Sequence, residues 1–234
     1  MHKSPHIREF SKNSDSYEKY SFLQKKIASE LLKNIDFKPQ KILDIGCGDG
    51  VVFQTIDWEI KKFVGIDLSK EMLLKHPKDK NVFLLEKDFD LLEEDYFKDF
   101  DMVVSSSSLQ WSKNPYIFLE KLENNSKSFA VSIFCDKTFF DFRKFFNVDT
   151  FLPSSEKLIS ILSNDTLHTV KKYTLNFKDN LSMLRYIKKS GVSGGIKRTS
   201  VKNIRDFIKN YDKKELEFEV LFMIKNPQNL HCKN

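Results

Sequence analysis

The chain has 234 residues, 40% of them hydrophobic and 31% charged, which is enough to bury one sizeable core. No apolar run is long enough to cross a bilayer, and the first residues lack the apolar segment of a secretory signal, so we expect a cytoplasmic protein with no membrane partner. Cys47, Cys135 and Cys232 stand far apart without a CxxC pair, which indicates a reducing compartment and no metal site.

The net charge is +6, and lysines scattered along the whole chain carry most of the excess. The chain has only five arginines, and solvated charge is the default on a protein surface. We therefore do not expect nucleic acid as a partner. A weak attraction to an acidic partner remains open.

Apolar residues recur at helical spacing near the start of the chain. Tyr20, Leu23, Ile27 and Leu31 share one face of a predicted helix over 16–34. Strands are then expected at 41–45, 61–67, 81–88, 100–107 and 128–134, with helices from about residue 50, at 69–76 and at 114–126. Strands that alternate with helical segments predict parallel βαβ units in an α/β fold.

The second half of the chain departs from this alternation. Helices are expected at 138–147, 154–162, 179–189 and 200–210, and long strands at 167–177 and 215–225. Two long strands at the end of an α/β chain favour an antiparallel hairpin at the edge of the sheet. We expect the helices inserted around this hairpin to cover an active site.

Three glycines on alternate positions follow the first strand. The stretch 41–50 reads KILDIGCGDG, with Asp44 on the strand and Gly46, Gly48 and Gly50 in a tight turn. The dinucleotide fingerprint G-x-G-x-x-G would place its third glycine where Val51 stands. A nicotinamide-dinucleotide site is therefore disfavoured.

The pattern D-x-G-x-G-x-G resembles motif I of the class I S-adenosylmethionine-dependent methyltransferases. This resemblance implies a Rossmann-like α/β fold, with a seven-stranded, mostly parallel sheet, helices on both faces and inserted helices capping the active site. It also implies S-adenosylmethionine as the cofactor, bound at the carboxyl ends of the strands.

The same resemblance assigns cofactor contacts strand by strand. Asp44 would lie near the ammonium end through water or backbone, Asp67 would accept from the ribose hydroxyls, and Asp88 from the adenine amino group, with Phe89 beside the ring. The expected set is Asp44, Gly46, Cys47, Gly48, Gly50, Asp67, Leu68, Asp88, Phe89 and Ser105. Taken singly, Asp67 is more often a helix cap, Asp88 a turn residue and Cys47 a small filler.

A Gln110–Trp111 pair after the fourth strand resembles two families of carboxylate methyltransferases. These are the malonyl-[acyl-carrier protein] O-methyltransferases of biotin synthesis and the trans-aconitate methyltransferases. The seven-residue spacing of Phe10, Tyr17 and Gln24 favours the first family. Segments around Arg143 and Arg185 also match that family, while Ser105–Ser106 and Ser-Gly-Val at 190–192 depart from its pattern.

The resemblance to the first family implies esterification of a malonyl carboxylate carried on acyl carrier protein. A carboxylate is ionised at pH 7 and needs no general base, and no histidine is expected beside these motifs. An arginine would bind the carboxylate through a bidentate fork, unless both arginines are surface residues. The expected catalytic set is Tyr17, Gln24, Gln110, Trp111, Arg143 and Arg185, although Trp111 could instead pack under the sheet edge.

We expect one domain over 1–234, with an N-terminal helical cover (1–35), a cofactor half (36–135) and a substrate half (136–234). The basic residues Lys188, Lys189, Lys197 and Arg198 would steer an acidic carrier protein to the site. An RNA or protein methyltransferase is an alternative, although no N/D-P-P-Y/F tetrapeptide is present. A non-catalytic cofactor-binding protein is a third possibility.

Overall fold

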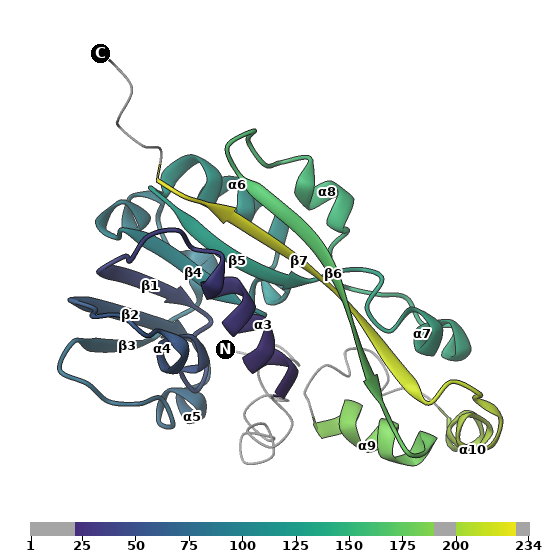
Figure 1. The fold of residues 1–234 in the computed structure, drawn as a ribbon. Helices are drawn as coiled ribbons and strands as arrows, with labels where there is room; N and C mark the ends of the chain where they lie inside the picture. Colours follow the sequence, from purple (N-terminus) through teal and green to yellow (C-terminus); the bar gives the residue numbers. More distant parts are fainter. Residues whose placement is uncertain (1–21, 190–199, 228–234) are drawn as a thin grey trace.

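The structure, a computed structural model, describes residues 22–189 and 200–227. Its centre is one seven-stranded sheet with the strand order β3-β2-β1-β4-β5-β7-β6 (Figure 1). The strands are β1 (Lys41–Ile45), β2 (Lys62–Asp67), β3 (Val82–Glu86), β4 (Met102–Ser106), β5 (Phe129–Phe134), β6 (Leu167–Asn176) and β7 (Glu215–Lys225). The neighbours among β1 to β5 pair in parallel, whereas β7 runs antiparallel to both β5 and β6. The predicted fold class and the predicted edge hairpin are confirmed.

The helices fall close to their predicted places. They are α3 (Phe22–Lys33), α4 (Val51–Thr55), α5 (Lys70–Leu73), α6 (Pro115–Asn125), α7 (Phe140–Phe146), α8 (Ser155–Ile159), α9 (Asn180–Lys189) and α10 (Val201–Asn210). Three short 3₁₀ turns, η1 (Phe89–Leu91), η2 (Glu94–Asp99) and η3 (Leu109–Trp111), were not predicted. Elements this short contain too few residues to produce a periodic apolar pattern.

Helices cover both faces of the parallel strands. On one face Ile42 and Met102 pack with Leu31 of α3, and on the other face Leu43 and Val103 pack with helical residues that include Phe118 of α6. Successive strand residues point to opposite faces, so strands covered on both sides read as continuous apolar runs. No helix in the described ranges is long and apolar enough to span a membrane.

The edge hairpin carries inserted helices to the carboxyl edge of the sheet. The last residue of β5, Phe134, pairs with Val220, and β7 continues beyond it to Glu215, which pairs with Asn176 at the end of β6. Helices α9 and α10 connect the strands there, and α7 follows β5 on the same side (Figure 1). By contrast, α8 packs beside α6 on the sheet face through Leu158.

Aromatic rings hold α7 and α10 together. Phe142 of α7 lies 5.2 Å from Phe207 of α10, and Phe145 lies 5.3 Å from the same ring. Phe207 also stacks on Tyr211 at 4.5 Å. The Phe-rich sequence of α7 is therefore explained by an apolar contact between the inserted helices.

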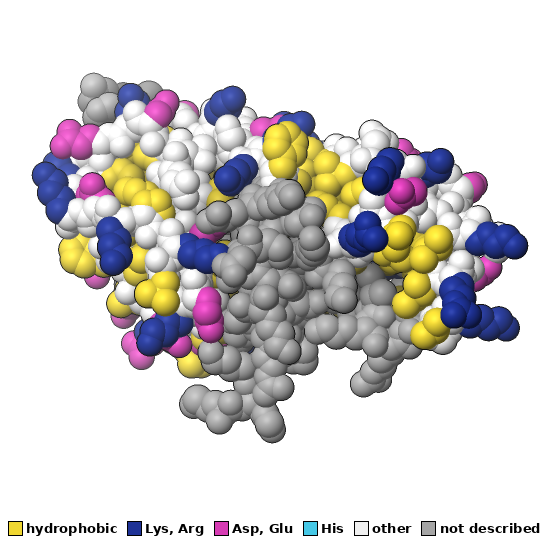
Figure 2. Space-filling model, turned by 90° about the horizontal axis from the view of Figure 1, so that it is seen from below, with side chains coloured by type: hydrophobic (Ala, Val, Ile, Leu, Met, Phe, Trp, Pro, Cys, Tyr) yellow, Lys and Arg dark blue, Asp and Glu magenta, His cyan; other side chains and the backbone are white. Residues whose placement is uncertain are grey.

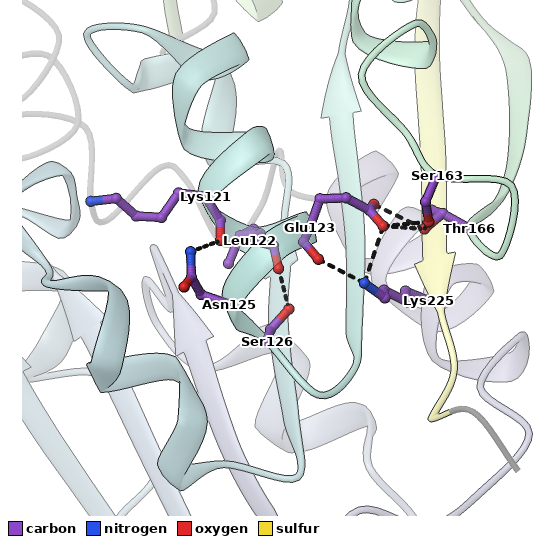
Figure 3. A network of polar contacts seen from close by, with 8 residues as sticks. All are labelled: Lys121, Leu122, Glu123, Asn125, Ser126, Ser163, Thr166 and Lys225. Atoms are coloured by element: carbon purple, nitrogen blue, oxygen red, sulfur yellow. Dashed lines mark hydrogen bonds and ion pairs between the residues drawn. The ribbon is translucent and has the colours of Figure 1, made fainter. Parts of the chain in front are cut away.

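A buried ion pair connects the last turn of α6 to the end of β7 (Figure 3). The Glu123 carboxylate lies 3.1 Å from Lys225 Nζ at the end of β7, and Glu123 is only 7% exposed. Its oxygens also accept from Ser163 Oγ at 2.5 Å and Thr166 Oγ1 at 2.9 Å. This network fastens α6 to both strands of the edge hairpin.

We expect Glu123→Ala to lower the free energy of unfolding by about 3 kcal/mol, since it leaves Lys225 largely buried without its counter-charge. Denaturant unfolding measures the change. Glu120→Ala removes an exposed carboxylate from the same helix and is expected to change stability by less than about 0.5 kcal/mol. Equal losses of unfolding free energy in the two variants would show that the Glu123 network stabilises the fold no more than an exposed carboxylate does.

Candidate active site

The glycine turn leads from β1 into α4 with three left-handed glycines. Gly46, Gly48 and Gly50 have φ of 70°, 55° and 88°. A Cβ on Gly46 would lie 2.3 Å from Ser108 Cβ, and one on Gly50 would lie 2.7 Å from Pro77 Cδ. At Gly48 the nearest atom would be 3.6 Å away. The protein's own packing thus excludes side chains at Gly46 and Gly50, whereas a Cβ at Gly48 would be in ordinary van der Waals contact with Met72 Cε.

Cys47 fills space inside this turn. A Cβ on Gly65 of β2 would lie 2.8 Å from Cys47 Sγ, so the thiol occupies the room that the glycine leaves. Burial raises the pKa of the Cys47 thiol well above its usual range. Both observations fit the small-filler alternative and give an unreactive cysteine.

Asp67, at the end of β2, fastens the glycine turn. Its Oδ2 accepts from the Gly48 amide at 2.9 Å and its Oδ1 from the Ser69 amide at 2.8 Å. The cap of α5 is Ser69 itself, whose hydroxyl accepts from Met72 N. Burial raises the pKa of Asp67, against the lowering effect of these backbone donors. Leu68 is half-buried between the two polar residues.

Asp88 follows β3 and makes the backbone contacts of a turn residue, which was the alternative role predicted for it. Its Oδ1 accepts from the Asp90 amide at 3.0 Å and caps η1, and its Oδ2 lies 3.1 Å from Lys113 Nζ. The neighbouring Phe89 ring is 8% exposed and packs edge-to-face on Phe118 at 5.4 Å. Contacts of Asp88 and Phe89 with adenine stay a prediction.

Asp44 is the most unusual group of the site. It is fully buried on β1 between Gly65 of β2 and Val104 of β4. Neither carboxyl oxygen has a hydrogen-bond partner among the described residues. Burial, and after it the negative charge of Asp67, holds the pKa of Asp44 well above its usual range. An unpaired buried carboxyl on the strand that leads into the glycine turn fits a ligand that brings a cation or N–H donors.

Serines at the end of β4 and in the loop after it join this strand to the end of β1 and to the glycine turn. Ser105 Oγ donates to the Ile45 carbonyl and Ser108 Oγ to the Gly46 carbonyl, both at 2.9 Å. Ser105 is fully buried, so its hydroxyl already serves the fold. Ser107 has φ of 57°, and its buried Oγ has no partner in the described part of the chain.

Two predicted site glutamines each keep one amide oxygen unpaired. Gln24 on α3 is 7% exposed and Gln110 in η3 is 5% exposed, and neither Oε1 finds a partner among residues 22–189 and 200–227. Trp111 stacks on Phe151 at 5.2 Å, a ring that is itself 42% exposed. Tyr17 lies outside the described residues. Gln110 therefore brings an unpaired amide oxygen to the loop that follows β4.

Arg143 and Arg185 lie in different surroundings, and the bidentate fork stays a prediction. Arg143 Nε donates to the Thr138 carbonyl at 3.0 Å, and Nη2 donates to the Asp136 carbonyl. Burial lowers the pKa of Arg143. This guanidinium holds the turn between β5 and α7, while Arg185 is exposed on α9.

His76 corrects one expectation, because it does lie beside the glycine turn. It is 2% exposed, packs on Phe53 and Phe63 at 5.6 and 5.7 Å, and its Nε2 would lie 2.9 Å from a Cβ on Gly50. Its Nδ1 bonds to the Pro77 carbonyl at 2.8 Å, and burial lowers its pKa. His76 is thus a neutral packing residue behind the turn.

Sequence reasoning missed Ser107, Ser108 and His76. The run of four serines after the fourth strand was the available signal for the first two, since small polar residues at a strand's carboxyl end often contact ligands or neighbouring loops. Nothing in the spacing marks His76. No group of three or more metal-ligating side chains occurs in the part of the chain that the structure describes.

The comparisons agree with this geometry. A family model described as a methyltransferase domain matches residues 43–127. The plantazolicin methyltransferase BpumL, solved with SAH, has a TM-score of 0.53 at 18% identity and covers 96% of this chain and 91% of its own. The YcgJ protein of Bacillus subtilis has a TM-score of 0.56 at 15% identity, over 85% and 98%. Residues 43–127 thus form a methyltransferase domain within a Rossmann-like α/β fold.

Several curated relatives carry one name, malonyl-[acyl-carrier protein] O-methyltransferase. That of Neorickettsia risticii is 27% identical over 202 residues, covering 78% of this chain and 79% of the relative. That of Haemophilus influenzae is 23% identical over 219 residues, covering 86% and 83%. The match to that of Anoxybacillus flavithermus is 29% identical but spans only 56% of this chain and 53% of the relative.

Proposed function

We propose that the enzyme methylates the free carboxylate of a malonyl thioester on acyl carrier protein, an early step of biotin synthesis. The observation that carries this proposal is the alignment of relatives with that name over 78% and 86% of the chain. The Gln110–Trp111 pair, which resembles that of the same family, supports it. The assignment of 136–234 to the substrate, and of the enzyme to the cytoplasm, belongs to the same proposal.

The site residues fit the cofactor and the reaction. Gly48, Asp67 and Asp88 would hold S-adenosylmethionine, which supplies an electrophilic methyl group on a sulfonium. A malonyl carboxylate is already ionised at neutral pH, so the chain needs no general base, and neutral His76 is buried behind the turn. Opposite charges neutralise as the new C–O bond forms, so a site that excludes water favours the step.

In this proposal Arg143 orients the substrate carboxylate with its remaining N–H donors and does not bind it through a bidentate pair of hydrogen bonds. Nε and Nη2 already donate to the backbone carbonyls of Thr138 and Asp136. The donors left over can orient a carboxylate without the tight grip that would reduce its nucleophilicity. Arg185 is exposed near the inserted helices and is free to approach an incoming thioester.

Product analysis tests the proposal. Labelled S-adenosylmethionine is supplied with malonyl-carrier protein, acetyl-carrier protein or trans-aconitate. Base-labile label on the malonyl carrier alone is expected, because an ester hydrolyses in base. Label on trans-aconitate would keep the chemistry and change the substrate, and label on none of the three would reject carboxylate methylation of this kind.

Basic side chains on α10 provide a docking surface for an acidic carrier. Lys202, Arg205 and Lys209 are all exposed on this helix. Figure 2 shows Lys and Arg side chains at the end of the molecule where α9 and α10 lie. The side chains of Lys188 and Lys189, and all of Lys197 and Arg198, lie outside the described residues.

Reversing Lys202, Arg205 and Lys209 to glutamate is expected to raise KM for malonyl-carrier protein about tenfold, because attraction to the acidic carrier becomes repulsion. Steady-state kinetics at low salt measure the change. KM for a small malonyl thioester is expected to stay constant, as is KM for the carrier in a control with exposed Lys38, Lys78 and Lys80 reversed. Equal losses on carrier and small thioester would contradict a docking role.

A further inference from the structure

The loop after β4 touches the glycine turn through Ser108, two residues before Gln110. Ser108 Oγ donates to the Gly46 carbonyl at 2.9 Å, and a Cβ on Gly46 would meet Ser108 Cβ at 2.3 Å. The two loops are therefore in contact with no space between them. Gln110 follows in η3 and is 5% exposed.

The orientation of the Gln110 amide is fixed by one hydrogen bond. Its Nε2 donates to the Ser107 carbonyl at 2.6 Å, and turning the amide over would place two oxygens against each other. Ser107 itself takes a left-handed φ of 57°, and its amide donates to the Ser132 carbonyl at 2.8 Å. A non-glycine residue held in this region is a strained conformation of the kind found at ligand sites.

This orientation leaves Gln110 Oε1 as a buried acceptor that has no donor among the described residues. Among the other unpaired polar atoms of the described residues, Gln24 Oε1 is an acceptor. The Ser107 hydroxyl and a protonated Asp44 carboxyl can donate, but neither is within hydrogen-bond distance of Gln110 Oε1. A buried carbonyl oxygen without a donor is costly, so a bound ligand has to supply an N–H or O–H.

A malonyl carboxylate has no such donor, but the cofactor has three kinds: the adenine amino group, the ribose hydroxyls and the methionine ammonium. Asp88 and Asp67 stand at the ends of β3 and β2, on the other side of β1 from β4. The donor left for the β4 side is the ammonium. We propose that Gln110 Oε1 accepts a hydrogen bond from the ammonium group of S-adenosylmethionine, so that Gln110 binds the cofactor rather than the methyl acceptor.

Calorimetric binding of two ligands tests this assignment without any methyl acceptor, so its outcome is independent of the proposed malonyl substrate. S-adenosylhomocysteine carries the amino-acid end, and 5′-methylthioadenosine lacks it. Gln110→Met keeps the shape of the side chain and removes the acceptor. We expect it to weaken S-adenosylhomocysteine binding about tenfold to a hundredfold and to leave methylthioadenosine binding unchanged.

The alternative roles of Gln110 give different results. Equal weakening of both ligands would mean that Gln110 only supports the loop, and unchanged binding of both would remove it from the cofactor site. Either result overturns the proposal. Gln40→Met, which alters an exposed glutamine at the start of β1, is the matched control and is expected to bind both ligands as the wild type does.

Discussion

Gly46→Ala is expected to lose both cofactor binding and several kcal/mol of stability, whereas Gly48→Ala is expected to lose chiefly cofactor binding. An alanine Cβ at 46 would lie 2.3 Å from Ser108 Cβ, so the β1 and β4 loops would have to separate. At 48 the nearest atom is 3.6 Å away, and the positive φ alone costs about 1 kcal/mol.

Thermal unfolding and binding of S-adenosylhomocysteine measure the two effects separately. Adding Ser108→Gly to Gly46→Ala removes the clashing side chain and is expected to restore part of the lost stability, because only the backbone strain at 46 and the lost Ser108 hydrogen bond remain. If Gly48→Ala bound the ligand normally, the cofactor would not approach the backbone at Gly48.

Asp44→Asn is expected to weaken S-adenosylmethionine binding by about tenfold to a hundredfold and to stabilise the free chain above mild acid. The pKa of Asp44 is raised in the folded chain, so its contribution to stability is present below the unfolded pKa and is lost as pH rises towards the folded pKa. Asparagine keeps the shape of the side chain but does not ionise, so the variant does not lose stability in this way as pH rises. Denaturant unfolding at about pH 4 and at pH 8, with the larger gain at pH 8, checks the sign.

Proton exchange on binding adds a second readout for Asp44. A cationic ligand group favours the ionised carboxyl, so the wild type is expected to release a proton on binding that the asparagine variant does not release. Calorimetry in buffers of different ionisation enthalpy measures that proton. An Asp44→Asn variant with unchanged affinity and no stabilisation would remove Asp44 from the cofactor site.

The sequence predicted the strands, and the acidic residues at their carboxyl ends, because both depend on local signals. Alternation of apolar strands and helices defines parallel units, and motif spacing placed Asp67 and Asp88 at successive strand ends, where the structure has them. The hairpin of β6 and β7 was also predicted, from two unusually long strands.

What the sequence could not predict depends on contacts between distant segments. The clash partner of Gly46 is Ser108, that of Gly50 is His76 with Pro77, and Arg143 is turned towards backbone carbonyls. None of these contacts leaves a periodic trace in the sequence. The left-handed backbone conformation of Ser107 could not be predicted from the sequence either, because serine is not a residue type that indicates a positive φ.

The most direct test of the cofactor site is a crystal structure of the chain with S-adenosylhomocysteine. We predict density across the carboxyl ends of β1 to β4, with the ribose hydroxyls within hydrogen-bond distance of Asp67 and the adenine beside Asp88. Ligand density at another edge of the sheet would contradict this cofactor site. So would a crystal grown with saturating S-adenosylhomocysteine that shows no ligand density at Gly48.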